Sequence, residues 1–102
     1  MALVNIESAL RKILNTLKKT AVGAGLEVLS YKRNRGITVI KKDGDIFLVR
    51  ERGYLDQELE CTGRELQKQL KSMMKREFPR SRKVRVYVLK DESEAGAARK
   101  KL

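Results

Sequence analysis

The chain has 102 residues, a length typical of one domain with a modest hydrophobic core. Apolar residues make up 41% and charged residues 36%, a balance that argues against a disordered chain and against a membrane protein. The single cysteine cannot form an internal disulfide, and the N-terminus lacks the pattern of a secretory signal. We therefore expect a cytoplasmic location.

The charge of the chain is strongly unbalanced. Lys and Arg number 24 against 13 Asp and Glu, which gives a net charge of +11. A field of this sign attracts polyanions and speeds their capture, so the expected partner is nucleic acid, either DNA or RNA. Aromatic residues make up only 5% and Trp is absent, which argues against a base-stacking platform of the kind that single-strand-binding proteins use.

The first predicted element is a helix near the N-terminus. Apolar residues recur at helical spacing from Ile6 to Ala21. Asn5 is a suitable N-cap, and Gly23 or Gly25 can end the helix. The pattern therefore predicts an amphipathic helix with one buried face.

Three strands are predicted next, over residues 26–32, 37–42 and 45–51. The Asp43-Gly44 pair suits a type I′ turn, so the last two strands are expected to form a hairpin. Both faces of this hairpin are largely apolar, which predicts a central position in the sheet.

This turn type also predicts the register of the hairpin. With two central residues in the turn, Thr38 faces Val49 on the neighbouring strand. Because side chains alternate between the two faces of a strand, Thr38 and Glu51 are then expected on the same face.

The second predicted helix starts at a capping box and ends before a proline. Thr62 and Glu65 have the spacing at which each side chain satisfies a backbone amide of the other residue. Pro79 cannot continue a helix. A last strand, in which valines alternate with polar residues, is predicted over residues 83–89.

These elements predict an α+β fold in a single domain, residues 1–89, with the order α-β-β-β-α-β. A central hairpin sheet is expected to be packed by two helices. The remaining residues, 90–102, have no core pattern and are predicted to form a flexible tail.

Basic residues cluster in three places: after the first strand, along one stripe of the second helix and around Pro79. In a nucleic-acid-binding protein such clusters contact phosphates from several elements. In a protein without that role they form a solvated helix face and charged strand edges. The predicted nucleic-acid-binding residues are Lys32, Arg33, Arg35, Lys68, Lys71, Lys75, Arg80 and Arg82.

Other site chemistry has little support in the sequence. The chain has no His and one Cys, which excludes a His-based triad and a Cys-rich zinc site. It has no P-loop and no dinucleotide fingerprint, and no cofactor is expected. Asp56, Glu58 and Glu60 alternate and could together hold a divalent cation. An exposed segment that offsets basic neighbours is the favoured interpretation, so no metal site is predicted.

Cys61 allows two interpretations. It lies just before a predicted helix N-terminus and close to Arg64, and both features favour a thiolate. The chain supplies no obvious partner base, however, so a small buried residue is the favoured interpretation.

The order of elements and the middle of the chain resemble a known family. A basic segment, Tyr31-Lys32-Arg33-Asn34-Arg35-Gly36, leads to the strand Ile37-Thr38-Val39-Ile40, the Asp43-Gly44 hairpin and the strand Ile46–Arg52. This arrangement is similar to small Holliday-junction-resolvase-like members of the restriction-endonuclease-like, or PD-(D/E)xK, superfamily.

Carried over residue by residue, the resemblance implies a degenerate site. The acid on the first hairpin strand of such nucleases falls on Thr38, the Glu of their last motif on Glu51, and the following Lys on Gly53. Metal-dependent cleavage needs two or more hard oxygen ligands and a group that orients the attacking water. The resemblance therefore implies a non-catalytic relative, with Glu51 as the remaining candidate for a catalytic residue.

Three functional hypotheses follow from the sequence. The first is a basic nucleic-acid-binding protein that contacts the phosphate backbone and is not an enzyme. The second is a protein-interaction module or homo-oligomer that uses an apolar patch of the sheet. The third is a metal-dependent nuclease that uses Glu51. None of them involves a membrane.

Overall fold

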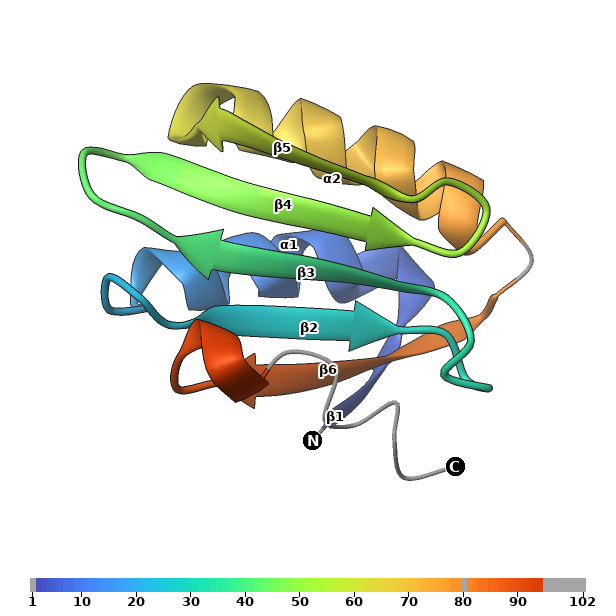
Figure 1. The fold of residues 1–102 in the computed structure, drawn as a ribbon. Coiled ribbons are helices and arrows are strands. Elements are labelled where there is room, and N and C mark those ends of the chain that lie inside the picture. Colours follow the sequence, from blue (N-terminus) through green and yellow to red (C-terminus); the bar gives the residue numbers. More distant parts are fainter. Residues whose placement is uncertain (1, 80, 95–102) are drawn as a thin grey trace.

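The strands predicted from the sequence pair into one antiparallel sheet. The computed structural model describes residues 2–79 and 81–94. In chain order, the elements in this part of the chain are β1 (Ala2–Asn5), α1 (Ile6–Lys18), β2 (Gly25–Leu29), β3 (Gly36–Lys41), β4 (Ile46–Arg52), β5 (Gln57–Thr62), α2 (Gly63–Glu77), β6 (Lys83–Leu89) and the short 3-10 helix η1 (Glu92–Glu94). The sheet has the order β1-β6-β2-β3-β4-β5, and α1 and α2 pack on one of its faces (Figure 1). The predicted α+β class is confirmed.

Both α-helices have the predicted caps. At the start of α1, the backbone N–H of Glu7 donates to Asn5 Oδ1 at 3.0 Å. At the start of α2, the Glu65 carboxylate accepts the backbone N–H of Thr62 at 3.2 Å, as a capping box requires. The end of α2 falls shortly before Pro79, where the prediction placed it.

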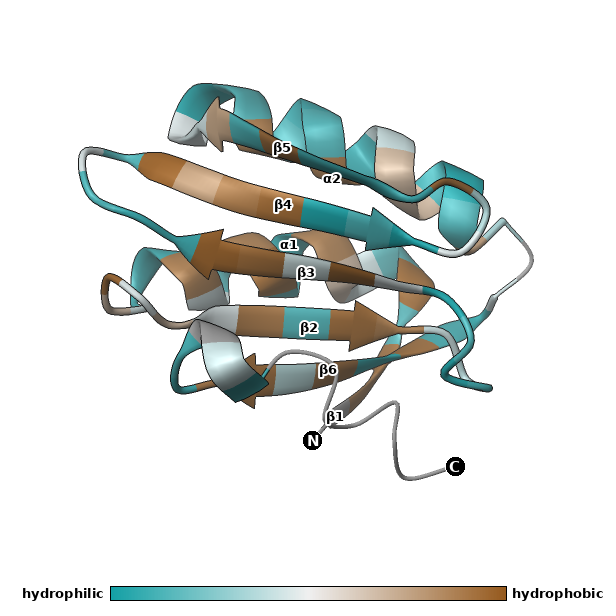
Figure 2. Ribbon diagram, in the orientation of Figure 1, coloured by the Kyte–Doolittle hydropathy of each residue, from teal (hydrophilic) through white to brown (hydrophobic). Residues whose placement is uncertain are grey.

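The main core lies between the helices and the sheet. A helix buries one stripe of side chains, and a strand presents every second side chain to it. The most deeply buried members of this core include Ala9, Ile13, Leu17, Leu26, Val28, Val39, Val49, Leu70, Met73 and Val84. A smaller cluster of Ile40, Leu48 and Leu89 lies on the opposite face. Figure 2 shows the hydrophobic residues concentrated in β2, β3 and the first half of β4, whereas β4 ends in hydrophilic residues.

The two edge strands, β1 and β5, are additions to the predicted order. β1 pairs with β6, and β5 pairs with β4. In β5, Leu59 and Cys61 pack toward the helices, while Glu58 and Glu60 lie on the other face. The acidic residues mask the strand pattern in the sequence, because a short charged edge strand looks like an exposed loop.

The turn of the β3–β4 hairpin differs from the predicted one. The loop comprises residues 43–45 and is closed by a hydrogen bond from Lys42 N to Ile46 O at 2.8 Å. Gly44 and Asp45 have positive φ angles of 69° and 61°. Asp45 tolerates this conformation better than most residues because its short side chain suits left-handed backbone.

This longer loop shifts the hairpin register by one residue. Thr38 faces Arg50 rather than Val49, and Ile37 faces Glu51. A shift of one residue moves every side chain of a strand to the other face. The prediction that Thr38 and Glu51 share a face is therefore wrong: Glu51 points toward the helices, and Thr38 points away from them.

The predicted tail, residues 90–102, is described only as far as residue 94, and the rest of it lies outside the described residues. Among the helices of the described chain, none combines the length and the apolar content needed to cross a membrane.

Candidate functional site

The turn between β2 and β3 is fixed by several hydrogen bonds at one end of the sheet. Ser30 N donates to Arg35 O at 2.9 Å, and Arg33 N donates to Ser30 O at 2.9 Å. The Ser30 hydroxyl forms a further bond with Asn34 Oδ1 at 2.9 Å. Because its backbone is held in this way, the turn presents its basic side chains from a defined position.

The loop between α2 and β6 lies against this turn. Arg35 Nη1 donates to Glu77 O at 3.5 Å, at the C-terminal end of α2, where a positive charge is favoured. Arg85 Nε donates to Tyr31 O at 3.0 Å, and the Arg85 guanidinium lies 4.7 Å from the centre of the Tyr31 ring. These contacts join segments that are 42 and 54 residues apart in the sequence.

An open hollow of ≈ 890 Å³ lies between the turn and the loop. Its basic residues are Lys32, Arg35, Arg82 and Lys83, and we call this site the basic concavity. None of these four side chains forms a salt bridge with any residue that the structure describes. Glu77 is the one acid among the described lining residues, and only 2% of it is exposed. The accessible surface of the basic concavity is therefore positive.

Further basic side chains lie on α2. A neighbouring hollow of ≈ 490 Å³ shares Pro79 with the basic concavity and is lined by Lys71 and Lys75, with Glu7 as an acidic neighbour. Lys68 is exposed about one turn earlier on the same helix. Within residues 2–79 and 81–94, these three lysines form no salt bridge either.

Of the eight predicted binding residues, Lys32, Arg35 and Arg82 line the basic concavity, and Lys71 and Lys75 line the neighbouring hollow. Arg33 is not part of the lining: its Nη2 donates to Tyr87 Oη at 3.4 Å, and its Nε is buried without a hydrogen-bond partner among the described residues. Arg80 lies outside the described residues. Lys83 lines the concavity although it was not among the eight residues singled out from the sequence.

A buried carboxylate holds α2 against β4. Glu51 is fully buried, and its two oxygens accept hydrogen bonds from Arg76 Nε at 2.7 Å and Arg76 Nη2 at 2.6 Å. Gln57 Nε2 donates to Glu51 Oε1 at 2.8 Å. Burial by itself raises the pKa of Glu51, but the hydrogen bonds from Arg76, Glu77 and Gln57 outweigh it and lower the pKa from 4.5 to about 2.

Glu77 lies next to Glu51 and holds the β4–β5 turn. Its two oxygens accept the backbone N–H groups of Tyr54 at 2.9 Å and Leu55 at 3.2 Å. Burial and the hydrogen bond with Glu51 raise the pKa of Glu77, although the two N–H groups lower it. Gly53 in this turn has a φ of 140°, and a Cβ at that position would collide with Glu77 Oε1.

The family resemblance predicts that Thr38 and Glu51 lie at one site, but the structure does not bring them together. Both oxygens of Glu51 are engaged by Arg76 and Gln57. Thr38 lies on the opposite face of the sheet, where its hydroxyl donates to Glu27 Oε2 at 3.2 Å. Glu51 is therefore placed as a structural residue that anchors α2.

The acidic segment also has structural contacts. Asp56 Oδ1 accepts Gly53 N at 3.2 Å within the β4–β5 turn. Glu58 Oε1 accepts Arg50 Nε at 2.9 Å, and Glu60 is exposed on the same face of β5. In the described part of the chain, no three His, Cys, Asp or Glu side chains come together as a possible metal site.

Cys61 is a buried core residue. Only 6% of it is exposed, and it packs in the cluster between the helices and the sheet. Burial and then the nearby Glu65 carboxylate raise the pKa of its thiol. The interpretation of Cys61 as a small buried residue rather than a thiolate is confirmed.

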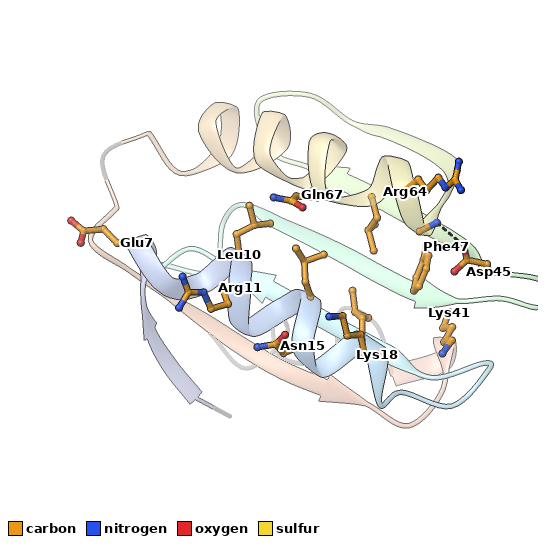
Figure 3. Close-up of a pocket in the computed structure, with 14 residues that line it drawn as sticks. Glu7, Leu10, Arg11, Asn15, Lys18, Lys41, Asp45, Phe47, Arg64 and Gln67 are labelled. Atoms are coloured by element: carbon orange, nitrogen blue, oxygen red, sulfur yellow. Dashed lines mark hydrogen bonds between the residues drawn. The ribbon is translucent and has the colours of Figure 1, made fainter.

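A third open hollow, of ≈ 900 Å³, lies between α1 and α2, and we call it the interhelical groove (Figure 3). Its apolar lining residues are Leu10, Leu14, Leu17, Phe47 and Leu66. Its charged lining residues are Arg11, Lys18, Lys41, Arg64, Glu7 and Asp45. An Asp45 carboxylate oxygen accepts the backbone N–H of Gly63 at 3.3 Å, so this acid is occupied at the start of α2.

Sequence reasoning missed one further residue of the basic concavity. Tyr31 lines it and is 62% exposed. Its position directly before Lys32 is the only signal in the sequence. The contact that fixes the Tyr31 ring comes from Arg85, and a pairing over 54 residues is not visible in a local pattern.

Comparison of the chain with protein-family models, with curated proteins and with solved structures gives no match. A fold alone does not define an activity, so the geometry and the charge of the basic concavity and of the interhelical groove are the guides to function.

Proposed function

We propose that the chain binds nucleic acid by contacting phosphates with the basic concavity. The observation that carries this proposal is the position of Lys32, Arg35, Arg82 and Lys83 around one hollow, without a salt bridge to any described carboxylate. Cations that the protein does not neutralise are available to phosphate oxygens, and charge-assisted bonds of this kind are the strong ones.

The four side chains contribute in different ways. An arginine guanidinium can bind two oxygens of one phosphate, whereas a lysine ammonium acts as a point charge. Arg35 is held by its bond to Glu77 O, so part of the ordering of its side chain is complete before a ligand arrives. Phosphates carry no sequence information, so this mode of binding has weak sequence preference and steep salt dependence. Binding to phosphates requires no reacting group, so the proposed function is binding without catalysis.

A charge-matched pair of variants tests the proposal. The first combines Lys32→Gln, Arg82→Gln and Lys83→Gln and removes three charges from the basic concavity. The second combines Lys12→Gln, Lys19→Gln and Lys90→Gln and removes three charges from exposed positions outside it. Fluorescence anisotropy with a labelled 20-base-pair duplex and with a single strand of the same length, at low salt, measures both affinities.

We expect the concavity variant to lose on the order of tenfold to a hundredfold in affinity, and the control variant to lose much less. Equal losses in the two variants would mean that only net charge matters and that the concavity is not the binding site. No binding of any nucleic acid by the unaltered protein at low salt would remove the proposal altogether.

A second candidate function is protein docking, and the interhelical groove favours it. An apolar floor bordered by Arg11, Lys18, Lys41 and Arg64 complements an amphipathic helix with leucines on one face and glutamates beside them. The 13 residues of α1 give the groove a length of about 20 Å, which fits a helical segment of three to four turns.

A synthetic amphipathic helix with leucines on one face and glutamates beside them tests this docking function. The control is a peptide of the same composition in scrambled order. Tight binding of the first peptide, weakened by Leu14→Gln in the groove, would support it. Equal binding of both peptides would mean simple charge attraction and would remove it. Light scattering tests the related prediction of a homo-oligomer.

The metal-dependent nuclease stays a prediction of the family resemblance. Its test is a nicking assay with Mg²⁺ or Mn²⁺ on plasmid and on branched DNA. Because Glu51 anchors α2, the Glu51→Ala variant must first be shown to be folded by circular dichroism. Cleavage that persists in the folded variant would show that Glu51 is not the catalytic residue.

A further inference from the structure

We infer that Tyr31 is a stacking site for one unpaired base, so that the ligand of the basic concavity is a single-stranded nucleic acid rather than a duplex. The inference rests on the proposed function and narrows it to one class of ligand. It starts from two facts: Tyr31 is 62% exposed, and it lines the same hollow as four cations that form no salt bridge with a described residue.

The Tyr31 ring is held in place before any ligand arrives. The Arg85 guanidinium lies 4.7 Å from the ring centre, and Arg85 Nε also donates to the Tyr31 main-chain oxygen at 3.0 Å. One arginine therefore fixes both the ring and its backbone. A side chain that is already ordered loses little freedom when a base stacks on it, which makes stacking more favourable.

The ring and the cations lie close enough to act on the same stretch of nucleic acid. Tyr31 is followed directly by Lys32, and both line the hollow with Arg82. A base stacked on the exposed ring would place its neighbouring phosphates beside these cations. Single-strand-binding proteins combine aromatic stacking and a basic groove in this way. In a duplex the faces of the bases are covered by their neighbours, so the ring has no partner there.

The composition limits this site to a single stacking position. Aromatic residues make up only 5% of the chain, so an extended platform is not built. Tyr54 is another exposed tyrosine, at 69%, but it does not line the basic concavity. It therefore serves as a matched control with the same side chain and similar exposure.

Three probes test the inference by fluorescence anisotropy: a ten-nucleotide oligo-dT, an oligomer of the same length and phosphate number whose sugars carry no bases, and a blunt duplex of ten base pairs. The proteins are the unaltered chain, Tyr31→Ala, Tyr31→Phe and Tyr54→Ala, each checked by circular dichroism for its fold. We expect oligo-dT to bind the unaltered chain more tightly than the base-free oligomer.

Tyr31→Ala is expected to weaken oligo-dT binding by about tenfold, because one base–aromatic stack is lost. Binding of the base-free oligomer should be unchanged. Tyr31→Phe and Tyr54→Ala are expected to bind oligo-dT like the unaltered chain. The stacking inference is overturned if Tyr31→Ala binds oligo-dT as tightly as the unaltered chain, or if the unaltered chain binds oligo-dT and the base-free oligomer with equal affinity. Either result leaves the proposal of phosphate binding in place. If the unaltered chain binds none of the three probes at low salt, the proposed function itself is overturned.

Discussion

Replacement of the buried Glu51 by Gln should strongly destabilise the fold. The substitution keeps the size of the side chain but replaces one carboxylate oxygen by an NH₂ group, which then faces the Arg76 guanidinium. In the native protein the carboxylate accepts two bonds from Arg76 and one from Gln57. Hydrogen bonds to a charged group are worth about 1.5–3 kcal/mol each, so losing one and weakening the others costs about 3 kcal/mol.

This loss is a large part of the stability of a small domain, which is typically about 5–15 kcal/mol. It corresponds to a fall in Tm of about 10–25 °C for a chain of this size. The assay is urea unfolding at pH 7, followed by far-UV circular dichroism. The control is Glu58→Gln, because Glu58 forms an exposed pair with Arg50 and its loss should cost about 1 kcal/mol or less.

The pH dependence supplies a second check on Glu51. Its pKa is about 2 in the folded protein, below the ordinary value of 4.5, so the carboxylate stabilises the fold fully above pH 4.5. That contribution is lost as the pH falls from 4.5 toward 2. The stability difference between the unaltered protein and Glu51→Gln should therefore shrink over this range. Equal effects of the Glu51 and Glu58 variants at pH 7, or a difference that persists at pH 2, would show that the Glu51 carboxylate does not stabilise the fold through these bonds.

Three further predictions follow from the same structure. Gly53→Ala should destabilise the protein more than Gly44→Ala, because both positions have positive φ but only at Gly53 does the new Cβ meet Glu77 Oε1; urea unfolding ranks the two variants, and equal losses would contradict the contact. Cys61 should react with a thiol reagent at pH 8 far more slowly in the native protein than in urea, because its thiol is buried and its pKa is raised; prompt labelling of the native protein would contradict this. Because the pKa of Glu77 is raised, Glu77 contributes stability at low pH that is lost as the pH rises past 4.5. The stability of the unaltered protein relative to Glu77→Gln should therefore fall between pH 4 and pH 7. A stability difference that stays constant over this range would count against the raised pKa.

The features that the sequence predicts well are local. The N-caps at Asn5 and Thr62 and the helix end near Pro79 depend on residues within one turn of each other. β6 has the predicted bounds, 83–89, because alternating valines mark a strand that is buried on one face. Such signals require no knowledge of how distant segments pair.

The features that the sequence did not predict depend on distant pairing or on fine backbone geometry. β5 is a strand because it pairs with β4, and its acidic residues mask that tendency. The hairpin register depends on whether Asp45 joins the turn with a positive φ, and this single residue decides on which face Glu51 lies.

In the candidate site, too, the local features are predicted from the sequence and the features that depend on distant pairing are not. The runs that contain Lys32 and Arg82 are visible as basic clusters in the sequence. Their meeting in one hollow follows from the antiparallel sheet, which brings the β2–β3 turn and the α2–β6 loop to the same end. The roles of Arg33, which contacts Tyr87, and of Glu51 follow from packing that no local pattern encodes.

The role of the basic concavity is tested most directly by the salt dependence of nucleic-acid binding, measured for the unaltered chain and for the variant in which Lys32, Arg82 and Lys83 are replaced by Gln. Each phosphate contact contributes about 0.7–0.9 to the slope of log K against log salt concentration. Phosphate binding by the basic concavity predicts a steep negative slope for the unaltered chain and a slope shallower by about 2–3 for the variant. Identical slopes for the two proteins would contradict it, because the basic concavity would then make no phosphate contacts.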